Sequence, residues 1–277
     1  MTESQLALLR RHGIRPVKRR GQNFLVDGNL ARAIAGDVLE LGSRVLELGA
    51  GGGALTVHLL ELGDRVLAVE VDRHLCRLLA TEYGDRAGFT LQEDDLARLD
   101  WSLAIDTAGP RPVVAGNLPY VLTSKVLFAL AERQADIAGA VFMVQKEVAE
   151  RLVAEPGGRD YGVLAVVLGS LFRIELMRTV PHTVFWPQPD VASAVVRLVP
   201  REPWPEAEYQ AFLTTVKTLF QQRRKQLGSA LRRLYGRDEA AIGALAARVE
   251  FDPRTRPEQL PAAKWRQLAR ALTEDDR

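Results

Sequence analysis

The feature that most constrains the fold is a glycine-rich turn between a short apolar segment and a helical pattern. Arg44–Leu48 has the composition of a buried strand, Gly49–Gly53 follows at once, and leucines then recur with helical spacing from Ala54 to Leu62. Such a turn lets a ligand approach the backbone closely, and the helix start presents free N–H groups. The pattern predicts an α/β sheet with a ligand site at this turn, although a lone turn of this kind also occurs in ordinary strand-to-helix connections.

Acidic residues end the next two strands that the sequence predicts. Arg65–Val69 is followed by Glu70, and Phe89–Gln92 is followed by Glu93-Asp94-Asp95. An acid about twenty positions after the first glycine suits the two hydroxyls of a ribose, and one at the next strand end can accept from an adenine amino group. A single strand-end acid is usually a solvated charge. Successive strands that end in glycine, acid and acid favour a cofactor containing a nucleoside.

The spacing of the glycines distinguishes two classes of nucleoside cofactor. Pyrophosphate dinucleotides favour G-x-G-x-x-G, whereas this chain has G-x-G-x-G with Glu47 before it in the strand. This pattern suits S-adenosylmethionine better, because that cofactor has no phosphate to bind. We expect the backbone at Gly49 and Gly51 to contact its amino-acid end, Glu70 its ribose and Asp94 its adenine.

Another strand end carries an amide and an aromatic ring. The apolar run Pro112–Gly116 leads into the sequence Asn-Leu-Pro-Tyr, and a helical pattern follows. The Asn117 side-chain oxygen and the Leu118 carbonyl can accept both N–H bonds of a conjugated amine such as adenine N6, so that its lone pair points at an electrophile. Tyr120 offers a face on which the base stacks. Four residues often match by chance, so this prediction depends on the cofactor site.

No His-Asp or Ser-His set accompanies Asn117, and the expected reaction needs none. A sulfonium electrophile is already activated, and the amine becomes acidic only as its new bond forms, so its proton can leave late. We therefore expect catalysis by orientation and by acceptors aimed at the developing positive charge. Orientation alone can lower such a barrier by roughly 7–11 kcal/mol.

Several longer segments are specific enough to indicate a family. They are Lys18–Leu25, Leu46–Thr56, Gly116–Tyr120, Val144–Leu152, Tyr161-Gly162, Phe185–Pro189, Val191–Leu198 and Phe220–Lys225. Over nearly the whole chain, these segments resemble the small-subunit ribosomal RNA adenine dimethyltransferases, the kasugamycin-sensitivity (KsgA) family.

The resemblance implies a Rossmann-like class I methyltransferase fold with a small C-terminal all-helical domain. It also implies transfer of two methyl groups from S-adenosylmethionine to N6 of each of two adjacent adenines. These adenines lie in the loop of the 3′-terminal hairpin of 16S rRNA, within the small (30S) ribosomal subunit or its precursor. Tyr120 and Phe185 would enclose the flipped base. The cofactor-binding positions that the resemblance adds are Gln22, Asn23, Leu25 and Asn117.

Two positions depart from the family pattern. Arg20 stands where the family usually has an aromatic residue, which puts the packing of the N-terminal segment in doubt. Asp190 follows Pro189 where a lysine is common, so a charge near the expected RNA face is reversed. Neither change replaces a group expected to take part in the chemistry.

The basic residues are unevenly distributed, although the formal net charge is only +2. No acid interrupts the stretch from Arg10 to Arg20 or the stretch from Lys217 to Arg237. Basic stretches are often solvated helix faces. Beside a site that accepts a nucleic-acid base, however, they favour binding of an RNA phosphate backbone. We expect Arg223, Arg224 and Lys225 to contact RNA.

The cysteine, the histidines and the apolar runs limit the partners and the cellular compartment that the sequence predicts. Cys76 is the one cysteine, so no internal disulfide can form, and the four histidines lack metal-ligand spacing. No apolar run is long enough for a membrane span, and Arg10-Arg11 interrupts the apolar start, so we expect no signal peptide. We expect a cytoplasmic monomer that needs no metal.

Three parts of the chain are predicted from the order of the patterns. Residues 1–43 form a basic and helical N-terminal segment with the cofactor-contacting Gly-Gln-Asn-Phe-Leu, and 44–200 form the methyltransferase domain, with late strands at Leu171–Val180 and Ala192–Val199. Residues 201–277 form a helical RNA-binding domain after a proline-rich linker. Its expected helices are Glu206–Leu227, Asp238–Val249 and Pro257–Leu272.

Other functions remain open from the residues alone. The same pocket would suit methylation of DNA adenine or of a protein glutamine amide. A non-enzymatic RNA- or DNA-binding factor is a second alternative, and a checkpoint role in subunit assembly is a third.

Overall fold

The computed structural model describes residues 3–17 and 21–275. Part of the predicted basic block (Lys18, Arg19 and the departure at Arg20) therefore lies outside the described residues. Contacts divide the chain into two units: Met1–Ala149 with Ile174–Pro200, and Glu150–Arg173 with Arg201–Arg277. The first is called the α/β unit and the second the helical unit. Residues 150–173, which the sequence placed in the methyltransferase domain, thus group with the C-terminal helices.

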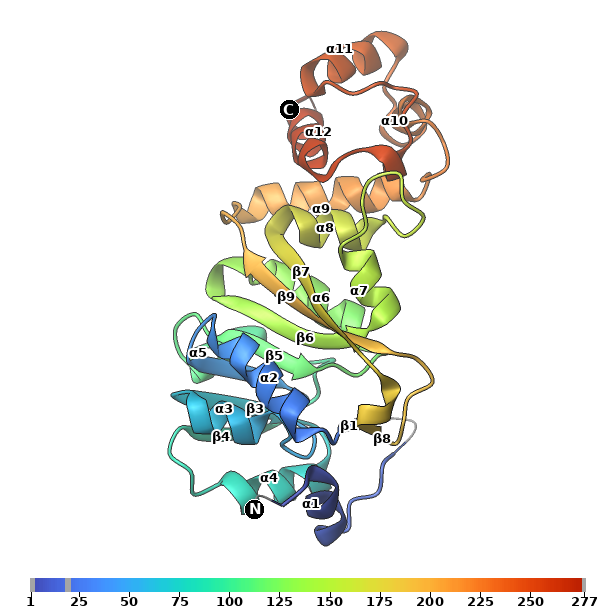
Figure 1. The fold of residues 1–277 in the computed structure, drawn as a ribbon. Coiled ribbons are helices and arrows are strands. Elements are labelled where there is room, and N and C mark those ends of the chain that lie inside the picture. The colour runs from blue at the N-terminus through green and yellow to red at the C-terminus, as the bar shows by residue number, and fades with distance from the viewer. Residues whose placement is uncertain (1–2, 18–20, 276–277) are drawn as a thin grey trace. The chain divides into compact units, whose positions relative to one another are not determined.

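The α/β unit alternates helices and strands along the chain (Figure 1). Its elements are α1 (Gln5–Arg11), β1 (Phe24–Leu25), α2 (Gly28–Leu39), β2 (Arg44–Leu48), α3 (Thr56–Leu62), β3 (Arg65–Glu70), α4 (Arg73–Tyr83), β4 (Phe89–Glu93), α5 (Trp101–Ala108), β5 (Val113–Asn117), α6 (Thr123–Glu132), the 3-10 turn η2 (Gln134–Asp136), β6 (Gly139–Gln145), most of β7 (Phe172–Val180), η3 (His182–Val184), β8 (Phe185–Trp186) and β9 (Ser193–Pro200). Helix α7 (Lys146–Leu152) crosses into the helical unit.

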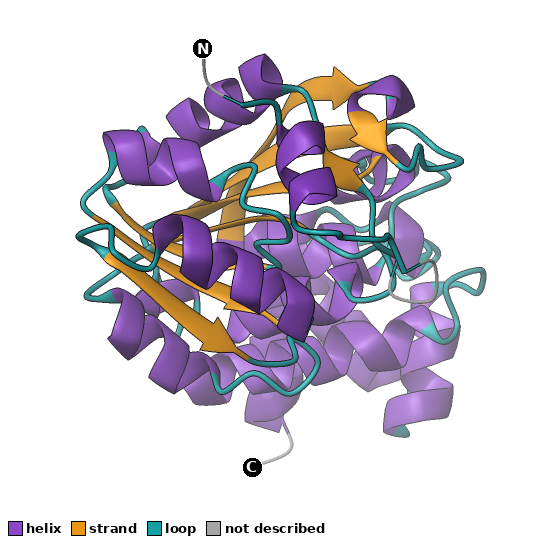
Figure 2. Ribbon diagram, turned by 90° about the horizontal axis from the view of Figure 1, so that it is seen from below, coloured by secondary structure: helices purple, strands orange, loops and turns teal. Residues whose placement is uncertain are grey.

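A seven-stranded sheet forms the centre of the α/β unit, in the order β4-β3-β2-β5-β6-β9-β7. Strands β2 to β6 pair in parallel, and β9 runs antiparallel to β6. Helices lie on both sides of the strands (Figure 2). Parallel strands covered on both faces are continuous apolar runs rather than alternating ones, which is the pattern of β2, β3 and β5. The predicted α/β fold with two late strands is confirmed.

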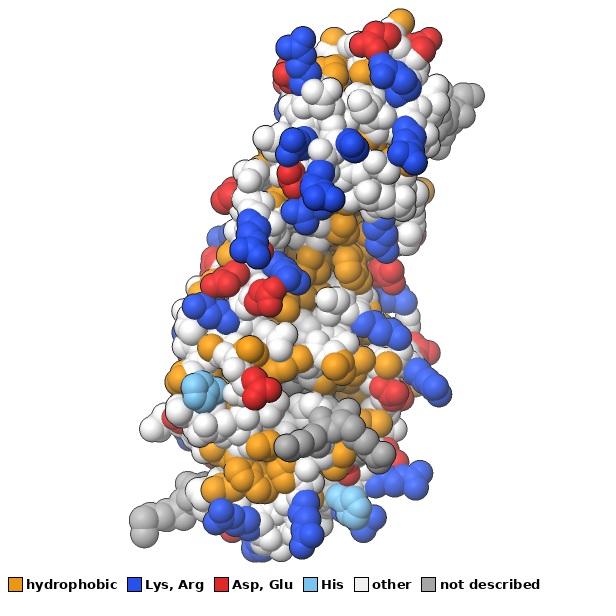
Figure 3. Space-filling view, turned by 90° about the vertical axis from the view of Figure 1, so that its right-hand side faces the viewer, with side chains coloured by type: hydrophobic (Ala, Val, Ile, Leu, Met, Phe, Trp, Pro, Cys, Tyr) orange, Lys and Arg blue, Asp and Glu red, His pale blue; other side chains and the backbone are white. Residues whose placement is uncertain are grey.

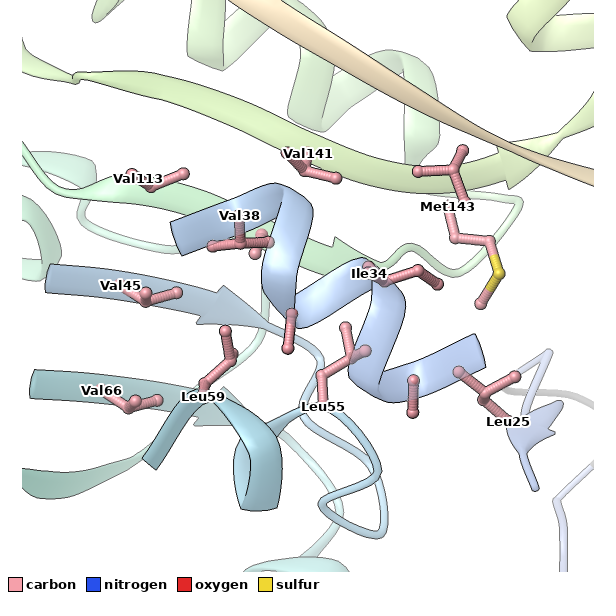
Figure 4. Close-up of a cluster of buried hydrophobic side chains, with 14 of the residues drawn as sticks. Leu25, Ile34, Val38, Val45, Leu55, Leu59, Val66, Val113, Val141 and Met143 are labelled. Atoms are coloured by element: carbon pink, nitrogen blue, oxygen red, sulfur yellow. The ribbon is translucent and has the colours of Figure 1, made fainter. Parts of the chain in front are cut away.

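Helices α2 and α3 pack on one face of this sheet (Figure 4). Ile34 and Val38 of α2 contact a core that includes Val45, Val113 and Val141, each at most 1% exposed. Helix α2 begins after Asp27, whose side chain accepts a 3.0 Å hydrogen bond from the Leu30 N–H. Tight packing of this kind holds the strands rigidly, so the residues at their carboxyl ends are fixed in space.

A separate two-stranded sheet joins the N-terminal segment to a late part of the chain. Phe24 pairs with Trp186 and Leu25 with Phe185, in antiparallel register. The Val26 N–H donates to the Val184 carbonyl at 2.9 Å. The segment predicted to contact the cofactor is therefore held by residues about 160 positions away.

The helical unit differs from its prediction at one helix. Its elements are α8 (Val163–Leu171), α9 (Glu206–Phe220), α10 (Leu227–Tyr235), α11 (Glu239–Val249), the 3-10 turn η4 (Pro257–Gln259) and α12 (Ala262–Asp275). The expected continuous helix 206–227 is wrong after Phe220. Gln226 has an extended backbone, and the N–H groups of Leu227 and Gly228 donate to the carbonyls of Thr255 and Pro253. These distant acceptors satisfy the start of a new helix, α10, that the sequence analysis missed.

Buried polar contacts explain why residues 150–173 belong to the helical unit. The Tyr161 hydroxyl donates to the Leu260 carbonyl at 2.8 Å, and the indole N–H of Trp265 donates to the same carbonyl at 3.1 Å. Trp265 is completely buried. Across the ranges that the structure describes, no helix is long and apolar enough to cross a membrane.

Candidate active site

A cavity lies in the α/β unit where β2, β3 and β5 end, which is where open α/β sheets bind ligands. Residues from α1, the segment before β1 and four strand-end loops line it. They are Gln5, Gly21, Gln22, Asn23, Phe24, Leu25, Glu47, Gly49, Ala50, Gly51, Gly52, Ala54, Leu55, Glu70, Val71, Leu75, Asp95, Leu96, Asn117, Leu118, Pro119, Tyr120 and Leu122.

The glycine turn is joined directly to the end of β3. Gly49 and Gly51 have φ values of 70° and 58°, which favour glycine. The Gly51 N–H donates to Glu70 Oε2 at 2.8 Å, and Glu70 Oε1 accepts from the N–H groups of Val71 and Asp72 at 2.9 Å each. These bonds hold the Glu70 carboxylate beside the turn, as a ribose-binding acid requires.

Two buried carboxylates make the cavity electrostatically unusual. Glu47 is 2% exposed and Glu70 is 6% exposed. Burial raises the pKa of Glu70 above its ordinary value, and burial raises the pKa of Glu47 to about 8. The Thr56 hydroxyl donates to Glu47 Oε2 at 2.6 Å and opposes part of that increase. The cavity therefore offers buried carboxyl oxygens to ligands that donate hydrogen bonds.

The raised pKa of Glu47 predicts a pH-dependent stability. The folded state keeps a proton that the unfolded chain loses above about pH 4.5, so this contribution is complete below pH 4.5 and is lost as the pH rises through about 8. Glu47→Gln stays neutral at every pH. We expect its melting temperature to rise relative to that of wild type as the pH increases from 5 to 8.5. Calorimetry of both proteins over this range measures the difference, and a difference independent of pH would contradict the prediction.

Asn117 is oriented by the N-terminal segment. Its amide nitrogen Nδ2 donates to the backbone carbonyl of Asn23 at 3.0 Å. A carbonyl can only accept, so this contact sets which end of the amide is the nitrogen and leaves Oδ1 as an acceptor. The same contact links a residue predicted to bind the cofactor to the residue predicted to bind the target amine.

The next residues of this loop are tied to the neighbouring strand and to helix α6. The Leu118 N–H donates to the Met143 carbonyl of β6 at 3.1 Å, which leaves the Leu118 side chain buried. The Thr123 hydroxyl donates to the Pro119 carbonyl at 3.3 Å. Tyr120 is partly exposed. The loop thus presents an amide, a carbonyl and a ring from a braced backbone.

Most of the predicted catalytic and cofactor-binding residues lie together in this cavity, but two do not line it. Phe185 is 3% exposed and packs in the core cluster that contains Leu25. Asp94 does not line the cavity, although its neighbours Asp95 and Leu96 do. The Asp94 carboxylate accepts hydrogen bonds from the Gln92 side-chain amide and from the Asp95 N–H. The predicted residues that do line it are Gln22, Asn23, Leu25, Gly49, Gly51, Glu70, Asn117, Leu118 and Tyr120.

The sequence analysis missed a wall formed by helix α1. The Gln5 side chain donates to the Gly52 carbonyl at 2.7 Å and lines the cavity. A Cβ at Gly52 would lie 2.6 Å from both Gln5 Nε2 and a Leu9 methyl group. The helix therefore rests directly on the glycine turn. No local signal at Gln5 indicates this contact, which only the fold creates.

Comparison with known proteins gives the family. A model of the ribosomal RNA adenine dimethylases matches residues 15–274. The chain belongs to this ribosomal RNA adenine dimethylase family. It is 44% identical to ribosomal RNA small subunit methyltransferase A of Anaeromyxobacter sp. (strain K), over 97% of this chain and 98% of that protein. Identity to the protein of the same name from Pseudomonas aeruginosa is 38%, over 93% and 94% of the two chains. The predicted family is confirmed.

Solved structures support the fold of this dimethylase. A dimethyladenosine transferase from Plasmodium falciparum superposes with a TM-score of 0.72 and 22% identity, over 88% of this chain and 95% of that one. The 23S rRNA methyltransferase ErmE gives a TM-score of 0.69 and 23% identity, over 91% and 100%. The predicted class I methyltransferase fold is confirmed.

The helical unit of this dimethylase presents the predicted RNA-binding residues in the turn after α9. Arg224 and Lys225 are exposed, and their side chains have no partner within residues 3–17 and 21–275. Arg223 is already engaged, because its guanidinium contacts Glu258 at 3.1 Å and the Arg159 carbonyl at 3.3 Å. Figure 3 shows many basic side chains on one face of this unit.

Proposed function

We propose that this dimethylase transfers two methyl groups from S-adenosylmethionine to N6 of each of two adjacent adenines in the 3′-terminal hairpin loop of 16S rRNA. It would act as a cytoplasmic monomer on the small (30S) ribosomal subunit or its precursor. The observation that carries this proposal is the Asn117 amide, which is fixed by Asn23 and shares one cavity with the glycine turn, Glu70 and Tyr120. A cofactor site and an amine-accepting site are thereby brought together.

The lining of the cavity fits S-adenosylmethionine. The turn at Gly49 and Gly51 gives close backbone access for an amino-acid end, and Glu70 Oε2, which accepts one backbone bond, has a lone pair left for a ribose hydroxyl. Val71 and Leu96 line the cavity near Glu70 and offer apolar surface to an adenine. We propose that Asp95 or the adjacent Asp94 accepts a hydrogen bond from the adenine amino group of the cofactor. When bound, the cofactor supplies a positively charged sulfonium with a transferable methyl group.

The protein itself orients the target amine. Asn117 Oδ1 and the Leu118 carbonyl accept the two N–H groups of adenine N6, and Tyr120 stacks on the ring. Both acceptors stabilise the positive charge that develops on the nitrogen. We assign the stacking surface to Tyr120, because Phe185 is 3% exposed and packs in the core cluster that contains Leu25.

Labelled cofactor distinguishes this function from its alternatives. Wild-type protein is offered small ribosomal subunits that lack this modification, duplex DNA, and a protein release factor. We expect label in 16S rRNA, and mass spectrometry should find it as dimethyladenosine in the 3′-terminal hairpin. Preferential labelling of the DNA or of the release factor would overturn the proposal.

The exposed turn after α9 predicts a salt effect. Arg224→Ala and Lys225→Ala should each flatten the dependence of log K on log salt by about 1, because each loses one phosphate contact. Arg223→Ala should change the slope less, since Arg223 is paired with Glu258. Filter binding to small subunits at several salt concentrations measures this, with Arg77→Ala on α4 as a control of equal charge. Equal slopes for Arg224→Ala and Arg77→Ala would contradict the prediction.

A further inference from the structure

The ring that is proposed to stack on the target base is anchored at its far end. The Tyr120 hydroxyl lies 3.1 Å from the hydroxyl of Ser193, and either group can donate. Ser193 is completely buried and is the first residue of β9. It pairs with Gln145 of β6, so the sheet fixes the position of its hydroxyl.

The backbone around Tyr120 provides little other restraint. Tyr120 lies in a turn closed by a 2.9 Å bond from the Leu122 N–H to the Pro119 carbonyl. The next side chain, Val121, is 81% exposed. A tyrosine side chain at such a turn can change its χ1 rotamer unless its hydroxyl is held. The contact with Ser193 fixes the far end of the ring and so restrains its position.

The acceptors and the ring are held by adjacent strands. The Leu118 N–H is bonded to Met143 of β6, and Tyr120 is bonded to Ser193 of β9. Met143 pairs with Val195, and Gln145 pairs with Ser193, in one antiparallel register. The β6–β9 register therefore sets the distance from the amine acceptors to the stacking ring.

We propose that Ser193 is a positioning residue for methyl transfer, which holds the Tyr120 ring at the position that the flipped adenine requires. This inference rests on the proposed function and adds to it a residue outside the cavity lining. Ser193 does not touch the substrate; it acts through Tyr120. Loss of the bond should leave cofactor binding intact and lower turnover.

A double-mutant cycle tests this role. Ser193→Ala, Tyr120→Phe and the double variant are assayed on small subunits that lack the modification. Each single variant should lower kcat about tenfold, the upper range for one hydrogen bond, with an unchanged KM for S-adenosylmethionine. The double variant should be no slower than the slower single variant, since both remove the same bond. Multiplicative losses, or kcat within twofold of wild type for either single variant, would overturn the role.

A structural role of the buried hydroxyl gives a different result. It would lower the melting temperature of Ser193→Ala without changing kcat of the folded protein. Tyr161→Phe is the matched control, because it removes a buried tyrosine hydrogen bond in the helical unit and should lower stability alone. If Ser193→Ala does not fold, Tyr120→Phe decides: a tenfold lower kcat supports the role and an unchanged kcat overturns it. If wild type labels no rRNA, the proposed function fails and this role with it, whereas active wild type with unchanged variants rejects Ser193 alone.

Discussion

Replacing Asn117 by alanine is expected to lower kcat for methyl transfer by about 100- to 1000-fold, the loss that follows removal of one preorganised group from a site of developing charge. The variant loses Oδ1, the proposed acceptor for the target amine. The cofactor cavity keeps the glycine turn and Glu70, so cofactor affinity should change only a few-fold. Binding to small subunits should be unchanged, because Asn117 carries no charge. Single-turnover transfer of labelled methyl groups measures the rate, and calorimetry measures cofactor binding.

Asn117→Asp separates the acceptor from its orientation. A carboxylate keeps an acceptor oxygen, but it cannot donate to the Asn23 carbonyl, and the two oxygens repel. We therefore expect Asn117→Asp to be nearly as slow as Asn117→Ala. Asn29→Ala, at an exposed amide on α2, is the matched control and should retain wild-type rates. Turnover of Asn117→Asp within a few-fold of wild type would reject the orienting contact.

Glu70→Ala is expected to weaken cofactor binding by about 10- to 100-fold. A hydrogen bond to a charged group is worth about 1.5–3 kcal/mol, and Glu70 Oε2 has one lone pair free for a ribose hydroxyl. The variant also leaves the N–H groups of Gly51, Val71 and Asp72 without their acceptor, so its melting temperature should fall. Calorimetric titration with S-adenosylmethionine, below the lowered melting temperature, measures the dissociation constant.

Two further variants test the cause of this loss. Glu70→Gln keeps one acceptor oxygen and should fall between wild type and Glu70→Ala in affinity. Glu132→Ala, at an exposed position on α6, should bind as wild type does. A dissociation constant for Glu70→Ala within threefold of wild type would mean that this carboxylate does not bind the ribose.

Local sequence patterns were sufficient to predict the parallel sheet and the residues at the carboxyl ends of its strands. Apolar runs such as Val113–Gly116 are buried on both faces, so their composition alone indicates the strand. The glycines and acids stand directly after such runs, and the carboxyl ends of parallel strands meet at one edge. The cavity between Gly49, Glu70 and Asn117 followed from that rule.

Contacts distant in sequence account for what the patterns could not show. The helix after Phe220 breaks because carbonyls near Thr255 satisfy the start of α10, and no residue near 221–226 signals those acceptors. Gln5 reaches the glycine turn only because α1 folds onto it. Phe185 matches a family segment, yet its pairing with Leu25 places the ring in the core.

The pairing of β1 with β8 has a consequence for synthesis of the protein. Phe24 and Leu25 emerge early from the ribosome, while their partners Phe185 and Trp186 emerge much later. A nascent chain that ends before residue 185 contains the glycine turn and Glu70, but its N-terminal wall has no strand to pair with. We therefore expect the segment at Phe24 and Leu25 to take its place beside the cavity only after about two thirds of the chain has been synthesised.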